Sequence, residues 1–197
     1  MNLIKITIIV LLFSIPCHAD LVTIEADDFP LTTSISDTFK FITLRGGPWE
    51  GFEGEIVAVD STHSMNLLGD NVLGYSWDIE WWSNNRKLRV IFDGLAKSLS
   101  IKILGKEGSQ RSATTIKGFN ESNELVTEVN RMAHSGVATL LSPGRGPYEI
   151  AYYEIYSYYP VAYDDIVIDY QPVPEPATVI LLALGALTMI NFSKNFQ

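Results

Sequence analysis

The chain has one cysteine and three histidines in 197 residues, and this scarcity limits the chemistry open to it. Cys17 and His18 lie near the N-terminus, so a product cleaved after Ala19 would keep only His63 and His134. Such a product has no disulfide, no thiolate nucleophile and no cysteine-based metal site. The sequence also lacks a G-x-S-x-G elbow, an H-E-x-x-H pair and a phosphate-cradling glycine loop. These absences exclude most nucleophilic and zinc-dependent enzymes. We interpret His63 and His134 as surface-loop residues, and a Ser–His–Asp triad that uses one of them is the alternative.

Basic residues are also few. Lys and Arg number 14 against 23 Asp and Glu, and the formal net charge is −9 at pH 7. Without Lys5, Lys194 and Glu175, residues 20–171 carry twelve basic and twenty-two acidic residues, a balance of −10. Nucleic acid and anionic lipid are therefore not expected as partners of this part of the chain, because both require a basic face.

No apolar run reaches the roughly 20 residues of an ordinary membrane-spanning helix. The first of two shorter runs, residues 6–15, follows Lys5 and precedes Cys17-His18-Ala19. A positive residue, an apolar stretch of about ten residues and a small residue before the cut are typical of a secretory signal. We predict a signal peptide at residues 1–19, cleaved before Asp20.

The second apolar run, residues 177–190, lies close to the C-terminus and contains no charge. Asn191 and Phe192 lengthen it, and the long side chain of Lys194 can reach a membrane interface. We predict one transmembrane helix at about 177–192, with the domain outside and Lys194 inside.

A proline-rich segment, Val173, Pro174, Glu175, Pro176 and Ala177, leads into this run. Proline fixes φ and disfavours helix at the residue before it, so the segment is expected to be extended and accessible. Pro-Glu-Pro followed by an apolar helix and a basic residue resembles the bacterial PEP-CTERM sorting signal, which we assign to residues 172–197. That family usually ends in several arginines, where this chain has Lys194. A plain C-terminal anchor behind a proline linker is the alternative.

The resemblance implies where the protein is located. It implies an exported protein, anchored in the inner membrane through its C-terminus and processed by an exosortase-like enzyme. The processed protein would then reside in the cell envelope or outside the cell. The family also implies a role associated with biofilm or extracellular polysaccharide.

Between the two ends, short stretches alternate apolar and polar residues, which is the period of half-buried strands. Such stretches occur at residues 75–81, 88–92, 99–103 and 125–129, and further strands are predicted at 148–159 and 161–170. Gly46-Gly47-Pro48 and Asp93-Gly94 are typical of turns, and a short helix is expected at 61–68. The pattern predicts that residues 20–171 form an all-β domain, an antiparallel two-sheet β-sandwich of jelly-roll type.

Aromatic residues provide the first candidate site. Adjacent Trp81 and Trp82 must point to opposite faces of a strand, so one of them is expected outside the core. Tyr152, Tyr156 and Tyr158 share one face of the tyrosine-rich strand. Exposed rings stack on sugars and also serve protein interfaces, so these five residues are candidates for binding polysaccharide. The alternative is that they pack across strands.

Acidic residues provide the second candidate site. Glu25, Asp27 and Asp28 follow the first predicted strand, and Asp164, Asp165 and Asp169 lie on the last. First and last strands are often neighbours in jelly rolls, so the six acids are a candidate structural Ca²⁺ site, since Ca²⁺ takes about six to eight oxygen ligands. The alternative is that they solvate strand ends.

Our interpretation from sequence is a non-catalytic envelope or extracellular-matrix protein. A carbohydrate-binding surface module is the first alternative. The second is a polysaccharide hydrolase with a carboxylate pair, because acids are plentiful enough for one to face a cleft.

Overall fold

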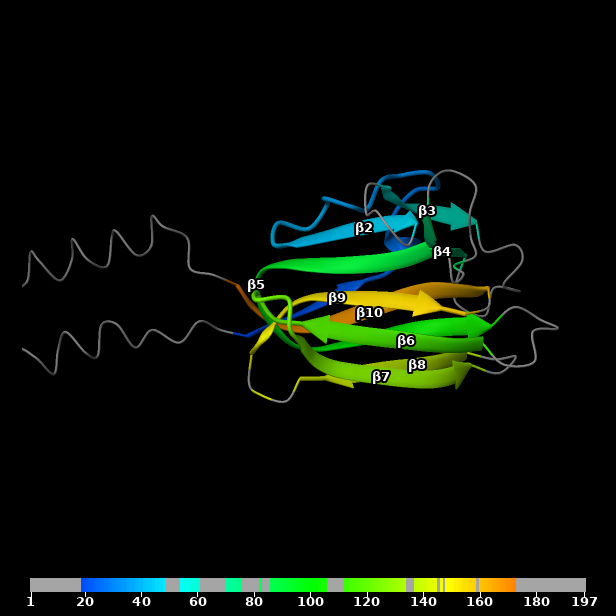
Figure 1. Ribbon diagram of the computed structural model, residues 1–197. Coiled ribbons are helices and arrows are strands. Elements are labelled where there is room, and N and C mark those ends of the chain that lie inside the picture. The colour runs from blue at the N-terminus through cyan, green and yellow to red at the C-terminus, as the bar shows by residue number, and fades with distance from the viewer. Residues whose placement is uncertain are drawn as a thin grey trace, which may run out of the picture. The chain divides into compact units, whose positions relative to one another are not determined.

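A computed structural model describes residues 19–48, 54–60, 70–75, 82, 86–105, 112–133, 137–144, 146, 148–158 and 160–172. This part of the chain consists of β strands and one 3-10 helix, η1 (Figure 1). The elements are β1 (Asp20–Ile24), η1 (Ala26–Asp28), β2 (Ile42–Pro48), β3 (Ile56–Asp60), β4 (Asn71–Tyr75), β5 (Arg86–Gly105), β6 (Ser112–Phe119), β7 (Leu125–Ala133), β8 (Val137–Pro143), β9 (Ile150–Ser157) and β10 (Val161–Pro172). All pairings between these strands are antiparallel, so the predicted all-β antiparallel class is confirmed.

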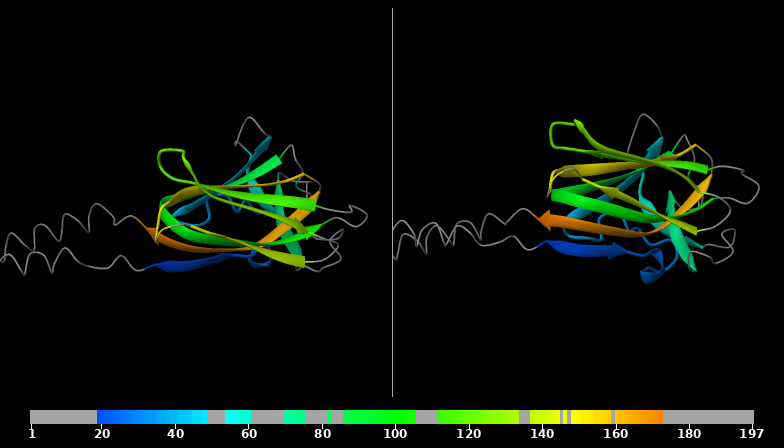
Figure 2. Two further views of the ribbon diagram at one scale, coloured as in Figure 1. Left: turned by 60° about the horizontal axis from the view of Figure 1, so that its bottom comes forward. Right: turned by 90° about the horizontal axis from the view of Figure 1, so that it is seen from below.

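Strand β5 takes part in both layers of the domain. Its first half, up to Phe92, pairs with β2 and β9, and its second half pairs with β10 from Leu95 and with β8 from Ser98. Gly94 lies between the halves with φ of 142°, a backbone conformation that side chains disfavour. The front layer therefore contains β2, the first half of β5, β9, β6 and β7. The back layer contains β8, the second half of β5, β10, β1, β4 and β3 (Figure 2). The two layers are hydrogen-bonded into one ten-stranded sheet, because β5 belongs to both.

Two turn predictions were wrong. Asp93-Gly94 lies inside β5, and Gly46-Gly47-Pro48 forms the end of β2. In both places the backbone stays in an antiparallel strand pair: Gly47 pairs with Lys87, and Gly94 pairs with Pro172.

The core lies between the layers and is built from alternate strand residues. Phe92 of the front layer packs edge-to-face on Tyr153, with ring centroids 6.0 Å apart, and stacks at 6.5 Å on Tyr170 of the back layer. The Tyr153 hydroxyl donates a 3.0 Å hydrogen bond to the Ser142 carbonyl of β8. Burying each large apolar side chain contributes about 1.5–3 kcal/mol, so a domain without a disulfide is held by this core.

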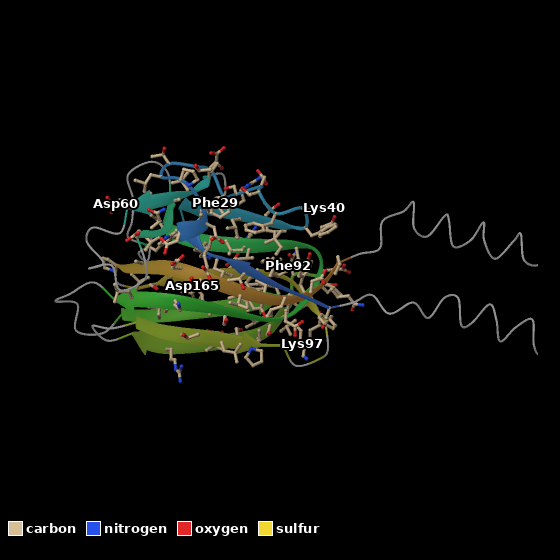
Figure 3. The ribbon with its side chains drawn as sticks, turned by 180° about the vertical axis from the view of Figure 1, so that it is seen from behind. Phe29, Lys40, Asp60, Phe92, Lys97 and Asp165 are labelled. Carbon is tan, nitrogen blue, oxygen red and sulfur yellow. The ribbon has the colours of Figure 1, made fainter. Side chains whose placement is uncertain are left out.

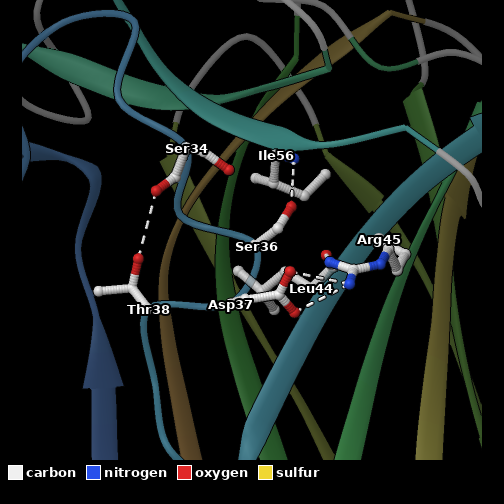
Figure 4. A network of polar contacts seen from close by, with 7 residues as sticks. All are labelled: Ser34, Ser36, Asp37, Thr38, Leu44, Arg45 and Ile56. Carbon is white, nitrogen blue, oxygen red and sulfur yellow. Dashed lines mark hydrogen bonds and ion pairs between the residues drawn. The ribbon is translucent and has the colours of Figure 1, made fainter.

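Polar side chains at residues 34–38, just before β2, form hydrogen bonds at the edge of the front layer (Figure 4). The Ser36 hydroxyl accepts a 2.7 Å hydrogen bond from the Ile56 amide of β3, and Arg45 of β2 donates to both carboxylate oxygens of Asp37 at 2.8 and 2.9 Å. Thr38 closes the turn by donating its hydroxyl proton to the Ser34 carbonyl at 3.2 Å. These bonds attach residues 34–38 to β2 and β3, and β2 is held beside β5 by antiparallel pairing from Ile42 opposite Phe92 to Pro48 opposite Arg86.

Several predictions fall outside the described residues. They are the signal peptide at 1–19 except for its last residue, the helix at 61–68, the sorting segment from Val173 to Ala177 and the transmembrane helix at about 177–192. Within the ranges given above, no helix is long and apolar enough to cross a membrane. The signal peptide, the helix at 61–68 and the transmembrane helix stay predictions.

Candidate functional site

The outward sides of β5, β9 and β6 carry a group of charged and aromatic side chains in mutual contact. Residues 88, 90, 153 and 155 point into the core, so alternation places their neighbours on the opposite side. Strand register then sets Arg89 and Lys117 on either side of Glu154. We call this surface the cation–tyrosine face, made up of Lys87, Arg89, Lys117, Phe119, Tyr152, Glu154 and Tyr156.

Glu154 is at the centre of the face and is only 8% exposed. One carboxylate oxygen accepts a 3.1 Å hydrogen bond from Lys87 Nζ, and the other accepts a 2.5 Å hydrogen bond from Arg89 Nη2. A carboxylate removed from water needs such charge-assisted bonds to offset its desolvation. Two cations therefore share this one carboxylate.

Tyr152 and Tyr156 precede and follow Glu154 on this face of β9, and other side chains pack against each of the two rings. Tyr152 stacks on Phe119 of β6 at a centroid distance of 4.9 Å, and the Arg89 guanidinium of β5 lies 4.9 Å from its ring centroid. Its hydroxyl donates to Asn123 Oδ1 at 3.2 Å. Burial raises the pKa of Tyr152, so the phenol keeps its proton at neutral pH. Neighbouring side chains cover the ring faces and Asn123 takes the hydroxyl proton, which leaves the ring edge and the hydroxyl oxygen, as an acceptor, for a ligand.

Tyr156 repeats this arrangement one step along the strand. Lys87 of β5 and Lys117 of β6 lie over its ring, with their Nζ atoms 5.5 and 5.8 Å from the centroid. Tyr156 is only 8% exposed, so its ring face is used within the protein and is not open for stacking on a sugar. Cation–π contacts contribute about 0.5–1 kcal/mol at exposed sites and about 2 kcal/mol when desolvated. Tyr158 packs edge-on against Tyr156 at 6.5 Å and is 59% exposed, the highest exposure among the four candidate aromatic residues that the structure describes.

Of the two adjacent tryptophans, Trp82 is the one in the core, so it is not available to stack on a sugar, and Trp81 lies outside the described ranges. Trp82 is fully buried, packs on Tyr163 with centroids 5.4 Å apart, and donates its indole proton to the Leu73 carbonyl at 2.6 Å. A ring enclosed in the core has no face for an external sugar, so Trp82 is a core residue.

The acids predicted to bind calcium lie at the junction of β1, η1 and β10. The expectation that the first and last strands are neighbours is confirmed, since β1 pairs with β10 from Asp20 opposite Tyr170 to Ile24 opposite Ile166. The acids themselves have separate partners. Asp27 accepts a 2.6 Å hydrogen bond from the Asn71 amide, and Asp165 forms an ion pair with Lys102.

Asp169 has other partners than Asp27 and Asp165. It accepts a 3.0 Å hydrogen bond from the Tyr148 hydroxyl, and its Oδ2 lies 3.8 Å from Lys97 Nζ. Figure 3 shows Lys97 and Asp165 at different points along the back layer. Glu25 is partly buried and Asp28 is exposed. In the described part of the chain, no group of three or more ligand-type side chains is arranged to hold a metal ion, so the calcium prediction gains no support.

Asp164 is the one buried acid of this group. Its Oδ1 accepts a 3.0 Å hydrogen bond from the Ala26 amide, and its Oδ2 has no hydrogen-bond partner among the described residues. Burial raises the pKa of Asp164 to about 7, and the charges of Asp165 and Asp27 act in the same direction. Next to it, Asp165 has φ of 45° where the β10–β5 register shifts, which is the geometry of a β-bulge.

The sequence located part of this site. Its period-2 pattern placed Tyr152 and Tyr156 on one side of their strand. It did not identify Lys87, Arg89, Lys117, Phe119 or Glu154, because their grouping depends on which strands are neighbours. The alternation of Lys87 and Arg89 with Leu88 and Val90 was the available signal.

The comparisons with known proteins concern the C-terminal segment and the fold. Residues 172–194 match the PEP-CTERM protein-sorting motif, as predicted. No curated protein matches the chain.

Similar solved structures include the K2 cleaved adhesin domain of Lys-gingipain, at 12% identity and a TM-score of 0.49, covering 76% of this chain and 99% of that one. The CBM22-1 xylan-binding domain of Paenibacillus barcinonensis Xyn10C has 10% identity and a TM-score of 0.44, with coverage of 79% and 97%. CsCBM6-3 of Clostridium stercorarium, solved with cellobiose, has 10% identity and a TM-score of 0.38, with coverage of 76% and 94%. At these scores the likeness carries no inference about function.

Proposed function

We propose that this is an exported, non-catalytic protein of the cell envelope or extracellular matrix. The match of residues 172–194 to the PEP-CTERM motif carries this proposal. In it, the signal peptide at 1–19 is removed, the helix at about 177–192 holds the protein in the inner membrane, and an exosortase-like enzyme processes the tail.

Intact-mass spectrometry of the protein from its host, with membrane and medium fractions analysed separately, tests this sorting. A mass that starts at Asp20 and ends near Pro174–Ala177 is the expected result. A mass that still includes Lys194, found only in membranes, would instead identify a plain anchor.

We further propose that the β domain binds polysaccharide through the cation–tyrosine face. The observation that favours this is the set of donors and acceptors that Lys87, Arg89 and Glu154 hold in one layer, beside the hydroxyl of Tyr152. Sugars present many hydroxyl groups, and hydrogen bonds to charged groups are about twice as strong as those between neutral groups. Binding would therefore rest on polar contacts with tyrosine edges, more than on stacking over tyrosine faces.

A binding role fits this face better than hydrolysis does. Glycoside hydrolysis by the usual route needs two carboxyl groups on opposite sides of the scissile bond. On the outward sides of β5, β9 and β6, all of which the structure describes, Glu154 is the single carboxylate, and both its oxygens are engaged. The next carboxylate on this side is Glu128 of the neighbouring β7, and Lys117 lies between it and Glu154 in the strand register. Retention of a labelled polysaccharide without turnover is expected, and release of shorter products would support the hydrolase alternative.

Replacing Tyr152 by Phe tests the binding face with little disturbance, because the ring and its stacking on Phe119 remain. Loss of one hydroxyl is expected to weaken retention in polysaccharide affinity gels by about three- to tenfold. The matched control is Tyr148→Phe, which removes a hydroxyl bonded to Asp169 on the back layer. Equal retention of both variants and the wild type would place binding elsewhere.

A further inference from the structure

We propose that the polysaccharide recognised by the cation–tyrosine face is acidic, and that Lys117 and Arg89 bind its carboxylate groups. This inference rests on the proposed polysaccharide-binding function and specifies the class of ligand.

The charge of this face is opposite to that of the chain around it. Its nine outward positions on β5, β6 and β9, all within the described ranges, are residues 87, 89, 91, 115, 117, 119, 152, 154 and 156. They include three cations, Lys87, Arg89 and Lys117, and one acid, Glu154. Residues 20–171 as a whole have a balance of −10. Since salt screens charges beyond about 8 Å at physiological ionic strength, a ligand on this face meets the local positive charge first.

The Lys117 amine has no carboxylate at hydrogen-bond distance among the described residues, so an anionic group of a ligand can approach it more closely than its present neighbour does. The nearest carboxylate to its Nζ is Glu128, with 3.8 Å between nitrogen and oxygen, whereas a charged N–H···O bond has a length of about 2.7–2.9 Å. The Lys117 side chain is 29% exposed. Burial lowers its pKa, but the Tyr156 hydroxyl, Glu128 and Glu154 together raise it further, so the amine stays protonated at neutral pH.

Arg89 is the second cation of the face that reaches solvent. Glu154 holds one end of its guanidinium and the Tyr152 ring supports its plane, yet 29% of the side chain remains exposed. Arg89 and Lys117 lie opposite the same residue, Glu154, on the two strands that flank β9. Strands are about 4.8 Å apart, so the two backbone positions are about 10 Å apart. This separation suits carboxylates on different sugar units of a chain better than two oxygens of one carboxylate.

The test compares each acidic polymer with its own neutral form. The full-length protein in detergent is assayed against polygalacturonate and alginate, and against the same polymers after chemical reduction of their carboxyl groups. We expect affinity for an acidic polymer to exceed that for its reduced form by at least about tenfold. We also expect this preference to shrink as salt rises from about 50 to 500 mM, because the Debye length falls.

Variants at Lys117 separate charge from fold. Lys117→Gln is expected to lower affinity for the acidic polymer by about tenfold and to leave the reduced polymer unaffected, and Lys117→Arg is expected to retain binding. Lys97→Gln is the matched control, because Lys97 also has a carboxylate at 3.8 Å, lies on the back layer and is more exposed. Near-UV circular dichroism of each variant verifies that it is folded.

The outcomes separate this inference from the function on which it rests. Equal affinity for the acidic and reduced polymers, or no effect of Lys117→Gln, would overturn the acidic ligand while leaving polysaccharide binding intact. If neither these polymers nor the host's own polysaccharides are retained, the proposed function fails as well.

Discussion

Asp164 shows how one residue can make the stability of this domain depend on pH. The burial that raises its pKa to about 7 from an ordinary value of 3.8 disfavours the charged form in the folded state. The folded protein therefore holds this proton more tightly than the unfolded chain does. The stability associated with it is fully present below about pH 4 and is lost as the pH rises through about 7. Three pKa units correspond to a change on the order of 4 kcal/mol in the free energy of unfolding.

Replacing Asp164 by Asn should remove this dependence. Asn resembles the protonated acid, and its carbonyl oxygen can still accept the hydrogen bond from Ala26. We expect the variant to be more stable than the wild type at pH 8 and to lose most of that advantage by pH 4. Urea unfolding at several pH values measures this difference, with Asp93→Asn, an exposed acid on β5, as control. A constant difference between variant and wild type across this range would show that Asp164 does not titrate there.

Among the elements, β5 determines how the two layers are connected. It spans 20 residues and serves both layers, so its bend at Gly94 sets where each layer begins. At φ of 142° a side chain is strained, with a free-energy penalty of about 1–3 kcal/mol.

Gly94→Ala should therefore lower the free energy of unfolding by about 1–3 kcal/mol. Asp93→Ala, one residue earlier and exposed, should change it by less than about 0.5 kcal/mol. Urea unfolding of both variants measures the difference. If the two are equally stable, the bend tolerates a side chain and glycine is not required there.

The same strand shows what the sequence could reveal about elements. Alternation identified 88–92 and 99–103 as strands because every second side chain, such as Leu88 and Ile101, is buried. It did not reveal that they are one strand, because Asp93-Gly94 has the composition of a turn and only pairing partners distinguish a bend from a turn. Alternation likewise predicted that one of Trp81 and Trp82 points away from the core but not which one, and the hydrogen bond from Trp82 to the Leu73 carbonyl places Trp82 inside.

The candidate site was harder to predict than the strands. Arg89 and Glu154 are 65 residues apart, and their contact depends on β5 and β9 being neighbours in one register. A period-2 pattern gives the face of each strand but not its partner. The sorting motif was recognisable because it is contiguous in the sequence.

At the scale of the whole molecule, both expected processing points adjoin paired strands. β1 begins at Asp20, the first residue after the predicted signal cleavage, and Asp20 pairs with Tyr170. β10 continues to Pro172, which pairs with Gly94 and is also the first residue of the matched sorting motif. In the sequence, only Val173 separates Pro172 from Pro174. In the proposed processing, an enzyme would act within a few residues of the paired end of β10.

Lengthening this connection should increase processing. Enzymes that act on a chain need it extended in their cleft, and opening the end of β10 to reach the motif costs free energy. Inserting six Gly and Ser residues between Pro172 and Val173 would supply the length without opening the strand. We expect a larger processed fraction, measured as the ratio of processed to unprocessed intact mass in the host. The same insertion in the exposed turn at residues 120–124 is the control and should leave the ratio unchanged. An unchanged or smaller processed fraction with the Pro172 insertion would mean that the enzyme tolerates, or requires, the folded domain beside its motif.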